Sequence, residues 1–570
     1  MNRPSGLLSL DDDVLLAIFS FLNSNAALST ASTSQRAYRL AISSFFADIY
    51  FGRRFDTDEQ DGSESLGLSR YMRAPEPLSQ VPRIRHLRHF IIGHVNEVDL
   101  PPLYGLLFEA LNLRTIEIRN MEFFIDNDGL VTKAIGAMHH LEQADFAQCG
   151  PATVSAFPEL LSSQKLTSLT LYFDEDIVDL PTLFLGLSSA PGIRTLDIAL
   201  IYLPIAPPMR PSHNFSLSSI RHLTLTSFPG PVPAYIVTLC PNIETLSLRL
   251  FSRDNTPATF SMSAEDRWPS QLKELSLPIR ITIAEDTVQR MKPVSCLSFG
   301  GETPIPSGAD FEESEEASGS DSEEQEAGRS DFEDLLRLFE TFRSTVLELH
   351  TKSVLAEAGR MWDTLRGAAP QLRSLSIAVE DGKCNVREYV DPLVAALRST
   401  SLIYLSLHFP RPSWSVDFSS MAEVDSICAP EIQRAETLRA LPLRLTEAVP
   451  SLRVLALSSC KLGRVFNWGV CHDLAGPRMI AEIGTEEGIQ RQWGPGSESL
   501  NAPMRKISEL GAEFPRDERW WWVEGEGAAR TLIEIWREDG ERARDLIRRA
   551  DFDPEKSLDG FYSDKCRYER

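Results

Sequence analysis

One spacing of apolar residues recurs along most of the chain. An apolar residue is followed three positions later by a second and two positions after that by a third, as in Leu452, Leu455 and Leu457. Apart from two longer intervals, after Leu272 and after Leu402, successive copies start roughly 22 to 30 residues apart, so each copy predicts one short strand of a repeated unit. A unit of this length cannot bury its apolar side alone, and neighbouring units must therefore stack on one another. We expect an elongated α/β array.

The copies of this triplet extend over most of the chain. The clear ones are Leu113/Ile116/Ile118, Leu166/Leu169/Leu171, Ile193/Leu196/Ile198, Ile220/Leu223/Leu225, Ile243/Leu246/Leu248, Leu272/Leu275/Leu277, Leu372/Leu375/Ile377, Leu402/Leu405/Leu407 and Leu452/Leu455/Leu457, and the weaker ones are Leu87/Phe90/Ile92 and Leu141/Ala144/Phe146. The last clear copy continues through Cys460 and Leu462. Residues 80 to 465 thereby resemble leucine-rich-repeat proteins, and the resemblance implies an α/β solenoid of horseshoe form.

The residues that flank the inward positions of each strand are expected on the concave surface of the solenoid. They are rich in hydroxyl groups, which suits shallow contact with a protein or simply reflects strand propensity. The candidate target-binding residues among them are Arg119, Tyr172, Arg249, Tyr404 and His408. Because Arg119 and Arg249 lie several repeats apart, no arginine cluster for a phosphate is predicted on this surface.

The N-terminal residues 9 to 46 predict three short helices. The first helix carries two apolar stripes, Val14/Ile18/Phe21 and Leu15/Phe19/Leu22. The second and third helices supply apolar residues that can cover one stripe, whereas the other has no local partner. A helix with two apolar sides in so short a unit predicts docking on another protein or on the rest of the chain.

The string LLSLDDDVLLAIFSFLNSNAALSTASTSQRAYRLA at residues 7 to 41 resembles the F-box, although Asp11 and Tyr38 stand where that motif usually has proline and tryptophan. The apolar positions of the motif match Leu10, Val14, Leu15, Ile18, Phe19, Leu22 and Leu28. The resemblance implies that these residues bind the Skp-type adaptor of a cullin-RING ubiquitin ligase, as in fungal F-box proteins with divergent repeats. The chain would then be the substrate-recognition subunit, which is not itself an enzyme. Two alternatives stay open: helices that only cap the solenoid, and a repeat scaffold without a ligase.

Composition shifts divide the chain into segments. We expect an F-box domain at 1–50, a linker at 51–80, repeats at 81–300 and 332–465, an acidic disordered insertion at 301–331 and a C-terminal capping region at 466–570. The insertion is rich in Glu, Ser and Gly and cannot bury enough apolar surface to fold. In the capping region, Trp520, Trp521 and Trp522 predict a strand, and residues 528–550 predict a helix.

The charge and the cysteines exclude several classes of protein. A formal net charge of −24 disfavours nucleic acid as a partner, and the sequence shows no apolar run long enough for a signal peptide or a membrane span. Eight scattered cysteines without a CxxC pair indicate reduced thiols in an intracellular protein of the cytoplasm or nucleus. We find no motif for catalytic residues, a metal or a cofactor.

Overall fold

The computed structural model describes residues 10–568 except for 53–62, 174–179, 201–215, 250–257, 301–337, 352–366, 380–385, 410–420, 461–505 and several gaps of one to three residues. The predicted acidic insertion at 301–331 lies outside the described residues. The chain divides into two compact units, Met1–Leu272 and Lys273–Arg570, which are described separately below.

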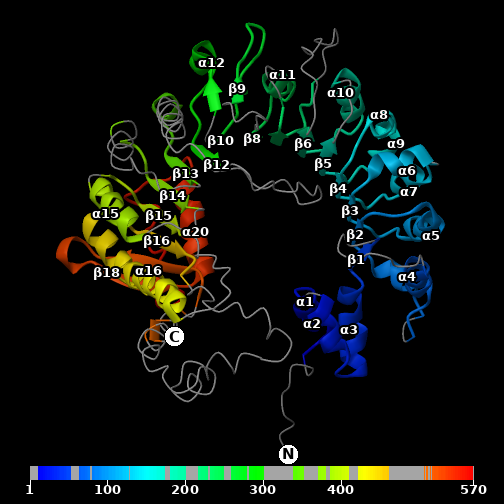
Figure 1. Cartoon of the computed structure of the whole chain (residues 1–570), viewed down its shortest axis with the longest axis horizontal. Coiled ribbons are helices and arrows are strands. Elements are labelled where there is room, and N and C mark those ends of the chain that lie inside the picture. The colour runs from blue at the N-terminus through cyan, green and yellow to red at the C-terminus, as the bar shows by residue number, and fades with distance from the viewer. Residues whose placement is uncertain are drawn as a thin grey trace, which may run out of the picture. The chain divides into compact units, whose positions relative to one another are not determined.

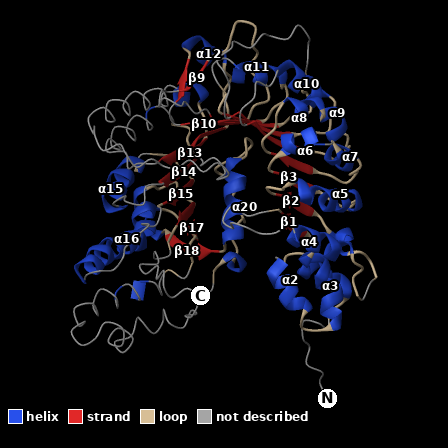
Figure 2. Ribbon diagram, turned by 45° about the vertical axis from the view of Figure 1, so that its right-hand side comes forward, coloured by secondary structure: helices blue, strands red, loops and turns tan. Residues whose placement is uncertain are grey.

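The architecture is α/β, with a long and mostly parallel sheet whose strands alternate with helices (Figures 1 and 2). The 16 strands follow the order β1-β2-β3-β4-β5-β6-β7-β8-β10-β12-β13-β14-β15-β16-β17-β18. Pairs from β1 to β8 and from β10 to β16 are parallel, whereas β17 pairs antiparallel with both β16 and β18. This arrangement is consistent with a leucine-rich-repeat-like solenoid.

The first unit holds the N-terminal helices and the first strands. Its strands are β1 (Asp48–Phe51), β2 (His89–Ile92), β3 (Thr115–Ile118), β4 (Gln143–Phe146), β5 (Ser168–Phe173), β6 (Thr195–Leu200), β7 (His222–Thr226), β8 (Thr245–Arg249) and β9 (Ala258–Phe260). Its helices are α1 (Asp12–Phe19), α2 (Ser24–Ala31), α3 (Gln35–Phe45), α4 (Ser63–Arg73), η2 (Arg83–His86), η3 (Glu97–Asp99), α5 (Leu100–Glu109), α6 (Met121–Asn127), α7 (Leu130–Gly136), α8 (Pro151–Ser155), α9 (Phe157–Leu160), α10 (Leu180–Ser188) and α11 (Val232–Leu239).

The second unit continues the pattern and adds an antiparallel end. Its strands are β10 (Glu274–Pro278), β11 (Ile281–Ile283), β12 (Cys296–Gly300), β13 (Val346–Thr351), β14 (Ser374–Val379), β15 (Tyr404–His408), β16 (Val454–Ser458), β17 (Arg519–Glu524) and β18 (Thr531–Ile535). Its helices are α12 (Glu285–Arg290), α15 (Val386–Leu397), α16 (Met421–Ala448), η4 (Gly527–Ala529), α20 (Arg537–Arg548) and η5 (Asp564–Cys566).

The apolar triplets position the strands as predicted. Every triplet places its second and third residues on a strand, and these side chains are buried, as Ile116 and Ile118 are on β3. The triplets missed β12 and β13, where Val294 and Ser344 occupy the first position. The Ser344 hydroxyl is buried and donates to the carbonyl of Val294 at 3.0 Å, so a polar residue fits the repeat core because its hydrogen bond is made.

Two segments differ from the sequence-based expectation. Where a linker was expected at 51–80, α4 lies and packs against α5. The helix expected at 528–550 begins only at Arg537, because Leu532 and Ile535 belong to β18, while the strand expected at Trp520 to Trp522 is confirmed as β17. Between β15 and β16, all of Met421–Ala448 forms the long helix α16.

Candidate functional site

The N-terminal module, which comprises α1, α2 and α3, is built around one side of α1. Leu15 and Phe19 are almost completely buried there and pack against Ala31 of α2 and Leu40 and Ala41 of α3. Leucine and phenylalanine four residues apart lie on one helical face, so this stripe forms the core of the module.

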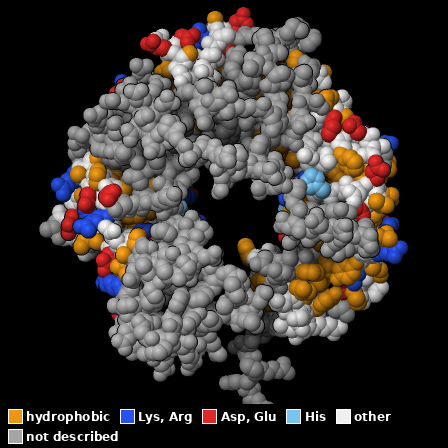
Figure 3. All heavy atoms as spheres, viewed as in Figure 1, with side chains coloured by type: hydrophobic (Ala, Val, Ile, Leu, Met, Phe, Trp, Pro, Cys, Tyr) orange, Lys and Arg blue, Asp and Glu red, His pale blue; other side chains and the backbone are white. Residues whose placement is uncertain are grey.

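The other side of α1 is an exposed apolar surface. Its residues and their exposed fractions are Leu10 at 39%, Val14 at 46%, Ile18 at 36% and Phe21 at 89%, joined by Leu28 of α2 at 47%. These five residues are called the apolar face below. Figure 3 shows hydrophobic side chains gathered on the surface in the part of the molecule that holds the N-terminal helices. Contiguous exposed apolar residues mark interaction sites in proteins.

The structure sorts the predicted adaptor-binding residues into three groups. Leu10, Val14, Ile18 and Leu28 belong to the apolar face, whereas Leu22 is only partly exposed. The inclusion of Leu15 and Phe19 is corrected, because residues with 0% and 1% exposure cannot contact a partner directly and instead support the helix that does. Phe21 was missing from the prediction although it lies on the same stripe as Val14 and Ile18.

Polar contacts fix the start of α1 on α3. The Arg36 guanidinium contacts the Asp12 carboxylate at 2.6 Å and donates to the carbonyl of Leu10 at 2.8 Å. Ser44 donates to the carbonyl of Phe19 at 3.1 Å at the other end of the helix. The apolar face is thus presented by a helix held at both ends.

The end of α3 is joined to the first repeats through aromatic and cationic side chains. Phe46 is buried with its ring centroid 5.9 Å from that of Tyr71, and the Arg83 guanidinium lies 4.3 Å from the Tyr71 centroid. Burial and a hydrogen bond with Glu76 raise the pKa of Tyr38. Within the first unit, the module is therefore anchored on the repeats and does not hang from a free linker.

Along strands such as β3 and β5, buried residues alternate with partly exposed ones. The side of the sheet that carries the partly exposed residues is called the polar face below, and a row of carboxylates lies on it. Glu117 on β3 pairs in register with Asp145 on β4, and Asp197 lies at the same position on β6. Burial, followed by the charges of Glu117 and Asp197, raises the pKa of Asp145 to about 7. Burial also raises the pKa of Asp197.

Three of the predicted target-binding residues surround this row. Arg119 contacts Glu117 at 3.3 Å, and its charge lowers the pKa of Asp145. Burial, then the charges of Asp145 and Asp197, raise the pKa of Tyr172 to about 12, against the positive charge of Arg249. Along the sheet, Tyr172 on β5 lies between Arg119, which follows β3, and Arg249 on β8, so the two arginines flank the carboxylate row. The sequence signal that was missed is an acid at the same strand position on β3, β4 and β6.

The prediction for Tyr404 is corrected in the second unit. Tyr404 is only 2% exposed, because α20 lies across β14, β16 and β17 and covers it together with Trp520, whose ring centroid is 6.1 Å away. Figure 2 shows α20 on the side of these strands opposite α15 and α16. Repeat patterns do not encode this long-range return of the C-terminal segment.

His408, the last predicted target-binding residue, lines a hollow of about 490 Å³ beside α20. Its imidazole lies 3.5 Å from the Ser459 hydroxyl, and the hollow also contains Glu348, which contacts Arg548 of α20 at 2.7 Å. Within the second unit, target contact by His408 is thus geometrically open, whereas contact by Tyr404 is blocked.

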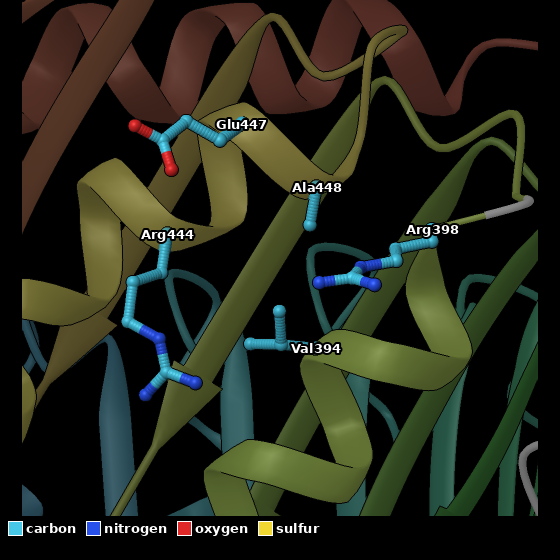
Figure 4. A pocket seen from close by; sticks show the side chains of 5 residues that line it. All are labelled: Val394, Arg398, Arg444, Glu447 and Ala448. Atoms are coloured by element: carbon cyan, nitrogen blue, oxygen red, sulfur yellow. The ribbon is translucent and has the colours of Figure 1, made fainter.

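A further hollow of about 400 Å³ lies between α15 and α16 (Figure 4). It is lined by Val394, Arg398, Arg444, Glu447 and Ala448. The Arg444 guanidinium forms an ion pair with the Asp391 carboxylate at 2.5 Å. The negative charge of Glu447 offsets the positive charge of Arg398. We assign no ligand to it.

Neither metal-site nor membrane geometry was found in the described part of the chain. Among those residues, no three His, Cys, Asp or Glu side chains converge as metal ligands would, and no helix combines the length and apolarity that a membrane span requires. In comparisons with known proteins, no family model and no curated protein matches the chain. What the chain does is therefore inferred from its own residues.

Proposed function

We propose that the chain is the substrate-recognition subunit of a Skp-cullin-F-box ubiquitin ligase. In this proposal the N-terminal module binds the Skp-type adaptor, and the repeats bind the target protein. The chemistry of ubiquitin transfer belongs to other subunits, so the chain is a receptor and not an enzyme. An intracellular location accompanies the proposal, and the five described cysteines, all of them buried thiols, suit a reducing compartment.

The observation that carries the proposal is the apolar face. Its five residues stay exposed although the module is anchored on the repeats, so nothing within the described chain covers them. This exposure supports the ligase over the alternative of a repeat scaffold, in which the second stripe of α1 would pack on the repeats. The match of Leu10, Val14, Ile18 and Leu28 to the apolar positions of the F-box indicates the adaptor as the occupant.

The anchoring of the module suits a receptor. A ubiquitin ligase must hold its target at a defined place relative to the adaptor. Contacts among Phe46, Tyr71 and Arg83 fix the module on the repeats, so they hold a bound target at a more constant distance from the adaptor than a flexible tether would. The polar face of β3 to β8 supplies the target surface in the first unit, with Arg119, Tyr172 and Arg249 around the carboxylate row.

Co-purification tests the proposal. The full chain is expressed with a Skp-type adaptor and cullin, beside the double variant Val14→Asp/Ile18→Asp and the control Val98→Asp. Val98 is 78% exposed on η3 and does not belong to the apolar face, so its variant introduces a carboxylate outside the proposed binding surface. We expect the natural chain and the control to retain the adaptor and the double variant to lose it. Absence of the adaptor from all three folded proteins would favour the scaffold.

A further inference from the structure

A small hollow of about 210 Å³ lies where the chain enters the strands β2 to β5, and we call it the edge pocket. It is lined by Arg88, Asn112, Arg114, His140, Glu142 and Lys165. Three of these side chains are cationic and one is anionic, so the pocket is locally positive in a chain whose formal net charge is −24. A positive pocket on a strongly acidic protein needs a specific reason.

The histidine adds a hydrogen-bond donor to the pocket. The ammonium of Lys165 lies 2.9 Å from Nδ1 of His140, and an ammonium can only donate. Nδ1 therefore accepts from the ammonium, and Nε2 is left to donate. Lys165 and His140 together supply a fixed positive charge and a second N–H.

Two arginines stand side by side in the edge pocket. The backbone N–H of Arg114 donates to the carbonyl of Arg88 at 2.8 Å, and the two residues immediately precede the neighbouring strands β3 and β2, about 4.8 Å apart. Arg88 donates to the carbonyl of Asn112 at 3.0 Å, which leaves its charge uncompensated. Arg114 approaches Glu142 only to 3.8 Å, with both side chains well exposed, so their attraction is weak.

An equivalent place later in the same unit shows that the fold does not require this second cation. Arg221 donates to the carbonyl of Asn242 at 3.1 Å, just as Arg88 donates to that of Asn112. On the next strand, however, the position of Arg114 is taken by Glu244, which lies 3.8 Å from Arg221. The contact between arginine and asparagine is structural at both places. Arg221 also has an arginine neighbour, because its backbone N–H donates to the carbonyl of Arg194 at 2.8 Å. The edge pocket adds a third cation, Lys165, which lies beside His140.

We propose that the edge pocket binds a phosphate-type oxyanion, either inorganic phosphate or a phosphate monoester. Guanidinium groups match two oxygens of such an anion at once, an ammonium supplies a point charge, and the imidazole N–H a further donor. An anion between Arg88 and Arg114 also relieves their mutual repulsion. The inference does not depend on the proposed function, because adaptor binding involves other residues.

Calorimetric titration of the full-length chain with inorganic phosphate at low ionic strength tests this inference. We expect Arg114→Gln and Lys165→Met to weaken binding about fivefold or more, because each removes one charge. Arg221→Gln is the matched control and is expected to leave affinity unchanged. Glu142→Gln is expected to strengthen binding about threefold, since it removes the competing carboxylate.

Three outcomes would overturn the inference. They are no heat of binding with the natural chain up to millimolar phosphate, an equal loss in Arg221→Gln and Arg114→Gln, and acetate binding as tightly as phosphate. Circular dichroism of each variant separates lost binding from lost folding, and the opposite sign expected for Glu142→Gln cannot arise from unfolding. Titration with phosphoserine then distinguishes the two sources: tighter binding than inorganic phosphate indicates a monoester, and equal or weaker binding indicates the free ion.

Discussion

Gly540 in α20 is the position where one added methyl group tests the packing of the C-terminal segment. A Cβ at this residue would lie 2.3 Å from Cε3 and 2.5 Å from Cδ2 of Trp520, where ordinary carbon contacts are about 3.5–4.0 Å. Gly540→Ala therefore forces α20 away from β17 by more than about 1 Å. An approach this close falls at the upper end of the usual cost of overpacking, about 2–3 kcal/mol, and the better helix propensity of alanine returns about 1 kcal/mol. We expect a net loss of about 1–2 kcal/mol.

Gly67 in α4 supplies the matched control. No atom lies within 4 Å of its added Cβ, so Gly67→Ala keeps only the propensity gain and should stabilise its helix by about 0.5–1 kcal/mol. Hydrogen exchange of amides in α20 and in α4 measures both effects locally, and a loss of 1.4 kcal/mol lowers protection about tenfold. Unchanged protection of α20 in Gly540→Ala, with α4 behaving as expected, would refute the close packing of α20 on Trp520.

Two further predictions concern buried charge. The folded-state pKa of Asp145 is raised to about 7 from an ordinary value near 3.8, so the folded state binds the proton more tightly and stability falls as pH rises between these values. Asp145→Asn should therefore stabilise the protein in thermal denaturation at pH 7.5, by on the order of 2–3 kcal/mol, and much less at pH 5; equal effects at both would contradict this. Glu431→Gln breaks a pair with Arg434 that is 0% and 4% exposed and should cost about 3–5 kcal/mol, against about 0–1 for the exposed Glu109→Gln, by chemical denaturation; equal costs would contradict the burial.

The strands were predictable because their signal is local. An inward residue such as Leu455 or Leu457 must be apolar wherever it stacks on its neighbours, so the triplet appears in the sequence itself. At β13 the apolar triplet is incomplete, because Ser344 stands at its first position. The Ser344 hydroxyl donates a hydrogen bond to the carbonyl of Val294 in the preceding repeat, and no sequence rule reveals that partner.

The candidate site was predictable only in part. The stripes of α1 identify which residues are apolar, but which stripe is buried depends on Leu40 and Ala41 of α3, so Leu15 and Phe19 could not be separated from Val14 and Ile18. The burial of Tyr404 depends on a helix that follows it by more than a hundred residues in the sequence. Likewise, the edge pocket joins residues from successive repeats whose side chains meet only after stacking.

The most direct test of the central claim is the affinity of the full-length chain for a purified Skp-type adaptor, measured by calorimetry with the natural chain and with Phe21→Ala. Phe21 is 89% exposed, so its truncation leaves folding unaffected, while burial of its ring in a complex contributes about 2 kcal/mol. The account predicts that the natural chain binds and that Phe21→Ala binds about 30-fold more weakly with an unchanged melting temperature. Equal affinities, or no binding by the natural chain, would contradict it.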